Sequence, residues 1–143
     1  MKFLLATDGS APALRAVKYA AKLVALMEES REHKVTLVSV HDDAGLRHAR
    51  ALVGSEAVQD YLRELSDKEL RPAMRALDAA GIRHDIVIRT GSIAGEIVAL
   101  ANKGRFDMIV LGSKGRGAMM DLLIGSVAQR VLATAKQPVT LVK

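Results

Sequence analysis

Short apolar runs alternate with longer segments of helical periodicity along this chain of 143 residues. Runs that are rich in aliphatic and β-branched residues and bounded by polar residues are typical of buried strands. Five such runs are present, over Lys2–Thr7, Val35–Val40, His84–Arg89, Asp107–Leu111 and Val139–Val142. Pro138 precedes the last run, and proline cannot donate to a sheet ladder, so we expect that strand at a sheet edge.

Between these runs, apolar residues recur three and four positions apart, which places them on one face of a helix. The pattern predicts a helix from Ala13 with Ser10 as N-cap, one over 56–80 that stops at Gly81, one after the cap Ser92 that stops near Gly104, and one carrying Val127, Val131 and Leu132. Pro72 lies inside the second helix and lacks an N–H donor, so we expect a kink there.

The alternation of strands and helices predicts an α/β fold: a single doubly wound, five-stranded parallel sheet with helices on both faces. We expect one domain over residues 1–143, because no linker or repeat interrupts the pattern. In such folds ligands bind beyond the carboxyl ends of the strands, where the strand order reverses. The first strand ends at Ala6, Thr7 and Asp8, and the fourth ends at Leu111. If these strands are neighbours, Asp8 faces the segment that follows Leu111.

That segment has the composition of a phosphate-binding loop. It reads Gly112-Ser113-Lys114-Gly115, and after nine further residues Gly125-Ser126-Val127 follows at a predicted helix start. Glycine lets backbone N–H groups come close to an anion, and a helix N-terminus adds unpaired donors and partial positive charge. Lys114 and Arg116 either add attraction for phosphate or lie in solvent. Asp8 binds the ligand or only caps the first helix, although Ser10 is the better-placed cap.

Composition narrows the function classes. The net charge of +5 favours acidic partners, but two Phe, two Tyr and no Trp offer little surface for stacking bases, so we expect no nucleic-acid partner. The sequence lacks cysteine, an apolar run long enough to span a membrane and a secretory leader pattern. We therefore expect a cytoplasmic protein with no membrane partner. The apolar run Met119, Met120, Leu122, Leu123 and Ile124 is either a partner or membrane stripe or, as we favour, packing beneath the glycine loop.

Signatures of dedicated enzymes are missing from the sequence. It contains no Gly-Lys-Ser/Thr of a P-loop and no Gly-x-Ser-x-Gly elbow, and Met120 stands where Gly-x-Gly-x-x-Gly needs its last glycine. The histidines show no metal-binding spacing, and we expect all four at the surface or in loops: His33, His41, His48 and His84. Asp42 and Asp43 either hold a metal ion together with phosphates or form a solvated turn.

The spacing Gly112, Gly115, Gly125 and Ser126 resembles the Gly-x2-Gly-x9-Gly-Ser signature of the ATP-binding branch of the universal stress proteins. The stretches Thr7-Asp8-Gly9-Ser10, Val40-His41-Asp42 and Gln137-Pro138-Val139 are similar to their counterparts in that family. The resemblance covers the whole chain. It implies an adenine nucleotide alpha hydrolase-like sheet with strand order 3-2-1-4-5 and a homodimer formed through the last strand.

The resemblance also implies a role for each site residue. Asp8 meets the ribose or the adenine, and the backbone of Val40 reads the adenine edge. Gly112 and Gly115 surround the ribose and α-phosphate, while Gly125-Ser126-Val127 holds the β- and γ-phosphates. The chain departs from the family pattern where Lys114 replaces a frequent His, Gly117 a frequent Thr or Ser, and Ile93 a frequent Pro.

These features predict an adenine-nucleotide-binding protein, with ATP or ADP as ligand together with Mg²⁺, that acts in regulation or the stress response. We expect at most slow ATP hydrolysis, because no residue is placed to position an attacking water or to act as an arginine finger. The alternative is a nucleotide-free dimeric module that docks a protein partner. The intact glycine signature argues against this alternative.

Overall fold

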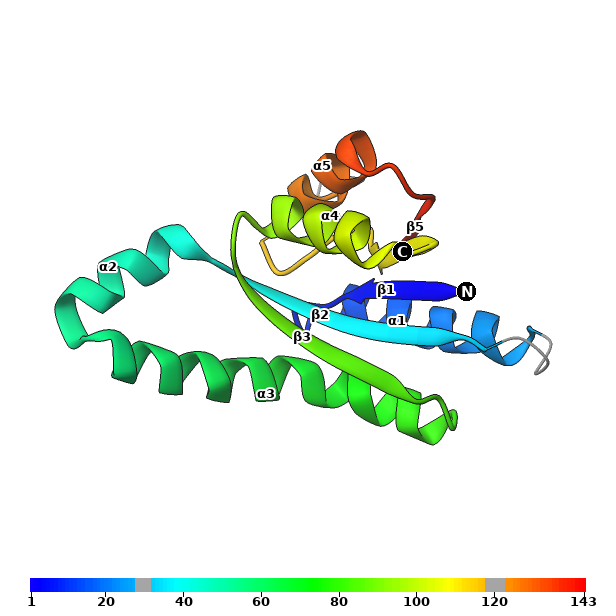
Figure 1. Ribbon diagram of the computed structural model, residues 1–143, viewed down its shortest axis with the longest axis horizontal. Coiled ribbons are helices and arrows are strands. Elements are labelled where there is room, and N and C mark those ends of the chain that lie inside the picture. The colour runs from blue at the N-terminus through cyan, green and yellow to red at the C-terminus, as the bar shows by residue number, and fades with distance from the viewer. Residues whose placement is uncertain (28–31, 118–122) are drawn as a thin grey trace.

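The computed structural model describes residues 1–27, 32–117 and 123–143. Within these ranges the strands form one parallel sheet, which contains β1 (Lys2–Ala6), β2 (Lys34–Asp42), β3 (His84–Gly91), β4 (Met108–Gly112) and β5 (Val139–Val142). The strand order is β3-β2-β1-β4-β5, as the sequence predicted (Figure 1). The sheet therefore places β1 beside β4 and leaves β5 at an edge.

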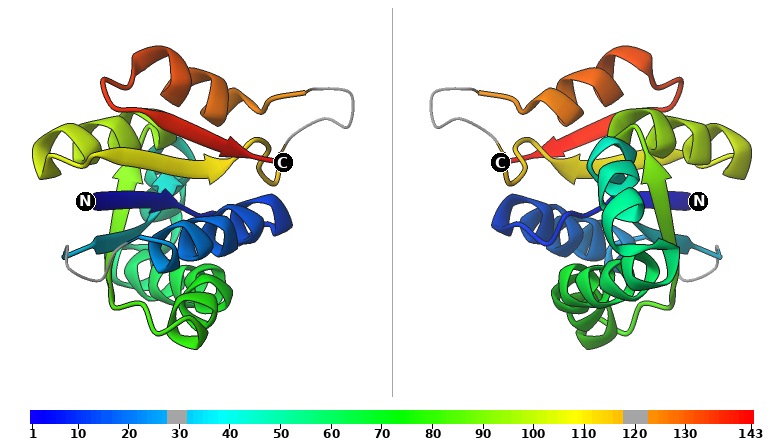
Figure 2. Two further views of the ribbon diagram at one scale, coloured as in Figure 1. Left: turned by 90° about the vertical axis from the view of Figure 1, so that its right-hand side faces the viewer. Right: turned by 90° about the vertical axis from the view of Figure 1, so that its left-hand side faces the viewer.

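Helices cover both faces of the sheet (Figure 2). Helices α1 (Ala11–Ala25) and α3 (Ser55–Ala79) pack on one face, and α4 (Ile93–Gly104) and α5 (Ser126–Thr134) pack on the other. Each strand supplies both layers because its side chains alternate between faces. Phe3, Leu5, Val35 and Leu37 join the α1/α3 layer, and Leu4, Ala6, Val38 and Ile109 join the α4/α5 layer.

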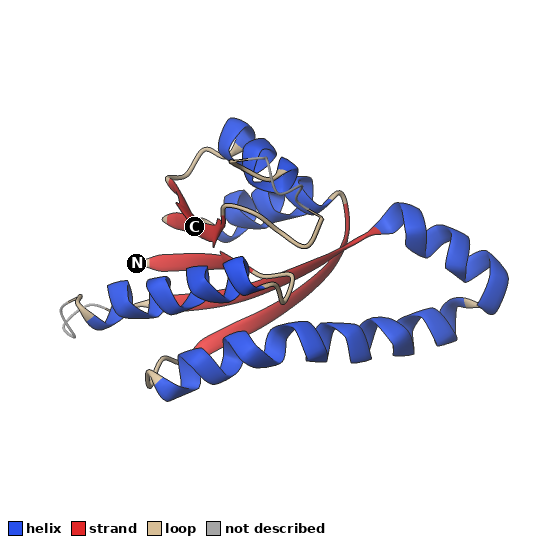
Figure 3. Cartoon of the chain, turned by 180° about the vertical axis from the view of Figure 1, so that it is seen from behind, coloured by secondary structure: helices blue, strands red, loops and turns tan. Residues whose placement is uncertain are grey.

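Helix α2 (Asp43–Val53) was not predicted from the sequence. It follows β2 directly and, with the first part of α3, extends beyond the sheet (Figure 3). Asp42 is its N-cap, since one carboxylate oxygen accepts a hydrogen bond from the N–H of Ala44 at 3.1 Å. Leu46 is its buried residue and packs against Val58 and Leu62 of α3. Leu46, Ala49 and Val53 do stand three and four positions apart, so the sequence carried a signal for this short helix that the prediction missed.

The other elements agree with the predicted ones to within a few residues. Ser10 caps α1 as expected, accepting a hydrogen bond from the Ala13 N–H at 3.3 Å. Strand β2 is longer than predicted because it continues through His41 to Asp42. Helix α3 runs through Pro72 to Ala79 as one helical element, and the kink stays a prediction.

The apolar run after the glycine loop falls partly outside the described residues, which exclude Met119, Met120 and Leu122. Of its two described members, Ile124 packs against the α4/α5 layer. Leu123 does not pack, and 85% of its surface is exposed, so the expectation of a packed run is wrong at that position. None of the described helices combines the length and the apolar character needed to cross a membrane.

Candidate functional site

A cavity of about 480 Å³ opens at the carboxyl edge of the sheet, where β1 and β4 end side by side. All twelve residues predicted for the site line it: Ala6, Thr7, Asp8, Val40, Leu111, Gly112, Lys114, Gly115, Arg116, Gly125, Ser126 and Val127. The described lining also includes residues that the sequence did not single out for binding, among them Val38, His41, Leu65, Glu69 and Ile97. The strand order explains this gathering, because it brings the ends of β1, β2 and β4 to one edge.

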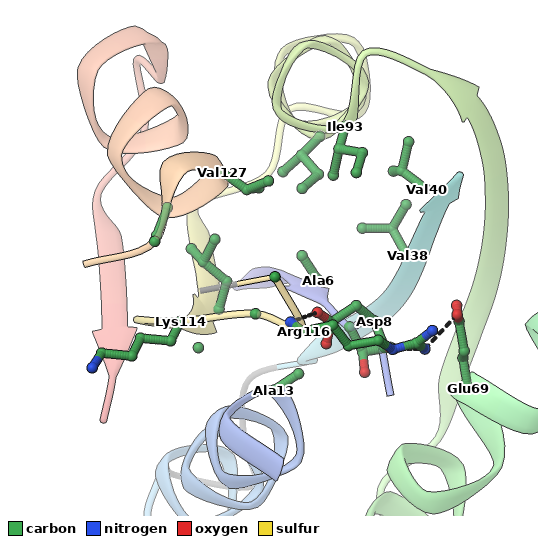
Figure 4. Close-up of a pocket in the computed structure, with 18 of the residues that line it drawn as sticks. Ala6, Asp8, Ala13, Val38, Val40, Glu69, Ile93, Lys114, Arg116 and Val127 are labelled. Atoms are coloured by element: carbon green, nitrogen blue, oxygen red, sulfur yellow. Dashed lines mark hydrogen bonds and ion pairs between the residues drawn. The ribbon is translucent and has the colours of Figure 1, made fainter. Parts of the chain in front are cut away.

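One side of the cavity is apolar. Figure 4 shows Val38 and Val40 of β2 facing Ile93 of α4 and Val127 of α5, with Ala6 of β1 below them. These side chains come from the sheet face that α4 and α5 cover. A flat apolar group such as a heterocyclic base fits a wall of this composition.

Asp8 connects the loop after β1 to the glycine loop, as the sequence predicted. One carboxylate oxygen accepts the N–H of Ser10 at 2.9 Å, and the other accepts the backbone N–H of Arg116 at 3.0 Å. Both oxygens therefore have protein donors. Asp8 is not the cap of α1, which is Ser10, and one of its two partners lies in the loop after β4.

At two of the three signature glycines, contacts within the protein leave no room for a side chain. A Cβ atom on Gly112 would lie 2.8 Å from the carbonyl carbon of Pro12 and 2.9 Å from the nitrogen of Ala13. A Cβ atom on Gly115 would lie 2.8 Å from Asp8 Oδ2. Side chains at these positions would collide with helix α1 or with the carboxylate that fastens the loop.

Gly125 differs from the other two, because no protein contact requires a glycine there. Its φ is −71°, and a Cβ atom would lie 3.4 Å from Lys114 Cα, an ordinary contact distance. Its N–H donates to the carbonyl of Ser113 at 2.7 Å, which connects α5 to the glycine loop. As N-cap of α5 it provides no side-chain acceptor, so the N–H groups of Ser126 and Val127 in the first turn have no intrahelical or cap partner.

A buried polar cluster lies below the cavity, between β2 and α3. The Ser39 hydroxyl donates to Glu69 Oε2 at 3.1 Å, and His41 Nε2 lies 2.8 Å from Ser66 Oγ and 4.0 Å from Glu69 Oε2. All four residues are buried. The expectation that His41 lies at the surface or in a loop is therefore wrong, because it belongs to β2 and is enclosed by α3. Burial lowers the pKa of His41, the charge of Glu69 raises it in part, and Arg116 lowers it further.

The expectation of a surface or loop position is confirmed for His33 and His48 and is wrong for His84. His48 is exposed on α2, and His33 lies in the loop before β2. His84 begins β3 and is partly buried, with its Nδ1 3.1 Å from the carbonyl oxygen of Ile82.

The Arg116 side chain runs along the cavity lining from the glycine loop to α3. Its Nη2 donates to the backbone carbonyl of Asp8 and to Glu69 Oε1, which connects the glycine loop to α3 (Figure 4). Lys114 lines the cavity as well, but its side chain extends away from it in Figure 4. Of these two cations, Arg116 is therefore the one that reaches over the site.

Asp42 and Asp43 begin a helix rather than a turn. Asp42 caps α2, and Asp43 pairs with Arg47 one turn further along at 3.3 Å. Within the described ranges, no group of three or more His, Asp or Glu side chains could hold a metal ion.

Comparison with known proteins places the chain in a family. The family model described as the universal stress protein family matches residues 1–143. Universal stress protein MJ0531 of Methanocaldococcus jannaschii is 32% identical over 143 residues, which cover 99% of this chain and 81% of that protein.

Two solved structures are similar over nearly the whole chain. The structure of MJ0577, also from M. jannaschii, has a TM-score of 0.84 at 25% identity and covers 99% of this chain and 94% of its own. A universal stress protein in complex with cAMP has a TM-score of 0.74 at 25% identity and covers 100% and 97%. Fold, family model and sequence identity agree, and the chain belongs to the universal stress protein family.

Proposed function

We propose that this protein binds an adenine nucleotide, ATP or ADP, in the cavity at the carboxyl edge of the sheet. The base would lie against the apolar wall formed by Val38, Val40 and Ile93. The phosphates would lie between the glycine loop and the N-terminus of α5. The cAMP complex of a relative with the same fold supports the choice of an adenine nucleotide.

The single observation that carries the proposal is the geometry at Gly125. This glycine has an ordinary φ of −71° and room for a Cβ atom, so neither backbone strain nor protein packing requires it. It stands beside the N–H groups of the α5 first turn, which have no partner within the helix, and a Cβ there would narrow the approach to those donors. A glycine at such a place is explained by close approach of a ligand anion.

We propose that Mg²⁺ comes with the nucleotide, bound to its phosphates. The carboxylates at the cavity already have protein partners: Asp8 accepts two backbone N–H groups, Glu69 pairs with Arg116, and Asp42 caps α2. Mg²⁺ commonly binds through substrate phosphates and water with only one or two carboxylates, so these residues do not need to form a cage.

Isothermal titration calorimetry of ATP and ADP in magnesium-containing buffer tests the proposal, together with mass analysis of any nucleotide that co-purifies. Gly125→Ala should weaken ATP binding roughly tenfold or more, because one or two hydrogen bonds to a charged phosphate are lost. Gly45→Ala is the matched control, since a Cβ there has nothing within 4 Å and Gly45 lies on α2, outside the cavity lining. Wild-type protein that binds no adenine nucleotide would contradict the proposal, and equal effects of the two alanines would remove Gly125 from the site.

We further propose a regulatory or stress-linked role in the cytoplasm, as a single-domain homodimer joined through β5. The absence of cysteine fits a reducing compartment, and β5 is a terminal strand at a sheet edge. ATP hydrolysis would be slow, because the described cavity wall holds no residue arranged to activate a water molecule. A nucleotide-free module that docks a protein partner is the alternative, and the calorimetry distinguishes the two.

A further inference from the structure

The ion pair between Arg116 and Glu69 joins an exposed side chain to a buried one. The Glu69 side chain is 7% exposed, whereas the Arg116 side chain is 53% exposed and belongs to the glycine loop. Among the described contacts, the Glu69 carboxylate accepts hydrogen bonds from the Arg116 guanidinium and from the Ser39 hydroxyl. A buried carboxylate is costly without a compensating charge, so Glu69 depends on a cation that solvent and ligands can reach.

A phosphate in the cavity would compete with Glu69 for the same guanidinium. Arg116 lies between Gly115 and Gly117, and its backbone N–H and its Nη2 both contact Asp8 at the cavity floor. Arginine binds phosphate in a bidentate manner, and a polyphosphate carries more charge than one carboxylate. The ligand therefore presents a stronger acceptor to Arg116 than Glu69 does.

We propose that Arg116 exchanges partners when the nucleotide binds: its guanidinium leaves Glu69 for a ligand phosphate, and one proton from solvent moves onto the His41–Glu69 pair. This exchange rests on the proposed function of the cavity. The proton balances the charge that Arg116 removes. Glu69 thereby makes nucleotide affinity depend on pH. The glycine loop by itself has no titratable group that would do so.

His41 is the natural acceptor for the proton because of where it lies. Its Nε2 is 4.0 Å from Glu69 Oε2 and 2.8 Å from Ser66 Oγ, so an imidazolium would face a carboxylate and a hydroxyl. The charged groups on the surrounding elements are Glu69 on α3, Arg116 on the glycine loop, Asp8 after β1, Arg89 on β3, and Asp42 and Asp43 at the junction of β2 with α2. Glu69 and Arg116 act on His41 in opposite directions.

The sign of the pH dependence follows from those directions. In the free protein, burial and Arg116 lower the pKa of His41 below its ordinary 6.5. When Arg116 turns to the phosphate, its repulsion is lost, and among the described residues no cation other than His41 pairs with Glu69, so the pKa of His41 rises. The bound state therefore holds more protons than the free state, and nucleotide affinity should increase as pH falls from the pKa of His41 in the bound state toward its lower pKa in the free state, which lies below 6.5.

The first experiment does not require a nucleotide. Titration of the histidine ring signals by NMR should show a higher pKa for His41 in Arg116→Ala than in wild type, with the exposed His48 as internal reference. Glu69→Gln should shift the pKa of His41 the opposite way, because it removes the attracting charge. An unchanged His41 pKa in Arg116→Ala would overturn the exchange, whatever the nucleotide does.

The second experiment measures proton uptake directly. Calorimetry of MgATP binding at pH 7, 6.5 and 6 in buffers of different ionisation enthalpy should show net proton uptake by wild type that grows as pH falls, and less uptake by Glu69→Gln. The difference between the two proteins cancels any proton uptake or release by the phosphates of ATP that is the same in both. Glu69→Gln should also bind ATP roughly 1.5- to fivefold more tightly at pH 8, the range that a half-exposed ion pair covers.

Glu64→Gln is the matched control, because it makes the same change on an exposed position of α3. If Glu69→Gln does not fold, Arg116→Ala decides, since it should bind ATP more weakly and without the proton uptake. ATP binding without a difference in proton uptake between wild type and these variants would overturn the exchange and leave nucleotide binding intact. Absence of nucleotide binding in every protein would instead reject the proposed function, and the His41 titration would then decide the coupling by itself.

Discussion

The Asp8 carboxylate should matter for stability as well as for ligand binding. Asp8→Ala removes both acceptors, one for the Ser10 N–H at 2.9 Å and one for the Arg116 N–H at 3.0 Å. A hydrogen bond to a charged group contributes about 1.5–3 kcal/mol when buried, and Asp8 is only partly buried. We therefore expect the free energy of unfolding to fall by about 1–3 kcal/mol for the pair of bonds.

Urea unfolding followed by circular dichroism measures this loss without any ligand. For a chain of this size the expected change corresponds to a decrease in Tm of roughly 3–10 °C. Asp60→Ala is the control, because Asp60 is an exposed carboxylate on α3. Asp8→Asn keeps one carbonyl acceptor, so its free energy of unfolding should lie between those of wild type and Asp8→Ala.

Two results would refute this reasoning. An Asp8→Ala protein as stable as wild type would show that the two hydrogen bonds contribute nothing net, and Asp8 would then act on the ligand alone. Equal destabilisation by Asp8→Ala and Asp60→Ala would show a general effect of charge removal. In either case the 2.8 Å separation between a Gly115 Cβ and Asp8 Oδ2 would no longer explain the glycine at 115.

Three further predictions test the surroundings of the site. In thermal unfolding, Gly81→Ala should destabilise the fold by roughly 1 kcal/mol, because its φ is positive. Gly9→Ala should cost more, because φ is positive there as well and a Cβ would also lie 3.0 Å from Glu69 Cα. Wild type should lose stability relative to His41→Gln as pH falls below 6.5, since the lowered pKa of His41 lets the unfolded chain bind the proton first, and urea unfolding at pH 7 and pH 5.5 measures the difference. Val139→Pro and Leu141→Pro should shift the protein toward monomer in light scattering; the carbonyls of Pro138 and Val142 accept from the β4 side, so the N–H groups of 139 and 141 face the free edge. A wild-type monomer, or a dimer unaffected by either proline, would contradict pairing through β5.

The sequence predicted the sheet well because each strand carries its own signal. The run Phe106–Leu111 is apolar at nearly every position, and β4 is buried on both faces accordingly. Strand β2 continues past its predicted end at Val40 because polar His41, like Ser39 within the predicted run, is buried on one face. Their polar groups find partners on α3 instead of water, and such compensation is invisible in a local window of sequence.

The sequence predicted those cavity-lining residues that belong to recognisable local patterns. The glycine spacing and the strand ends fixed which segments line the cavity, because these features depend on backbone geometry and strand order. Glu69 was missed because its partners are distant in sequence, 30 residues away for Ser39 and 47 for Arg116. The one available signal was that Ser66 and Glu69 occupy positions on the apolar stripe of α3, where leucine or alanine would otherwise stand.

The alternation of side chains along β2 gives the cavity its two kinds of wall. Val38 and Val40 point to the α4/α5 face and form the apolar side, while Ser39 and His41 point to the α1/α3 face and form the polar cluster. The strand ends therefore carry an apolar surface on one side of the sheet and a polar, charged cluster on the other. Because Arg116 lies at the boundary and its partner Glu69 belongs to the polar cluster, substitutions at Ser39, Ser66 or Glu69 should change how binding responds to pH. Substitutions at Val38 or Ile93 should change affinity equally at every pH.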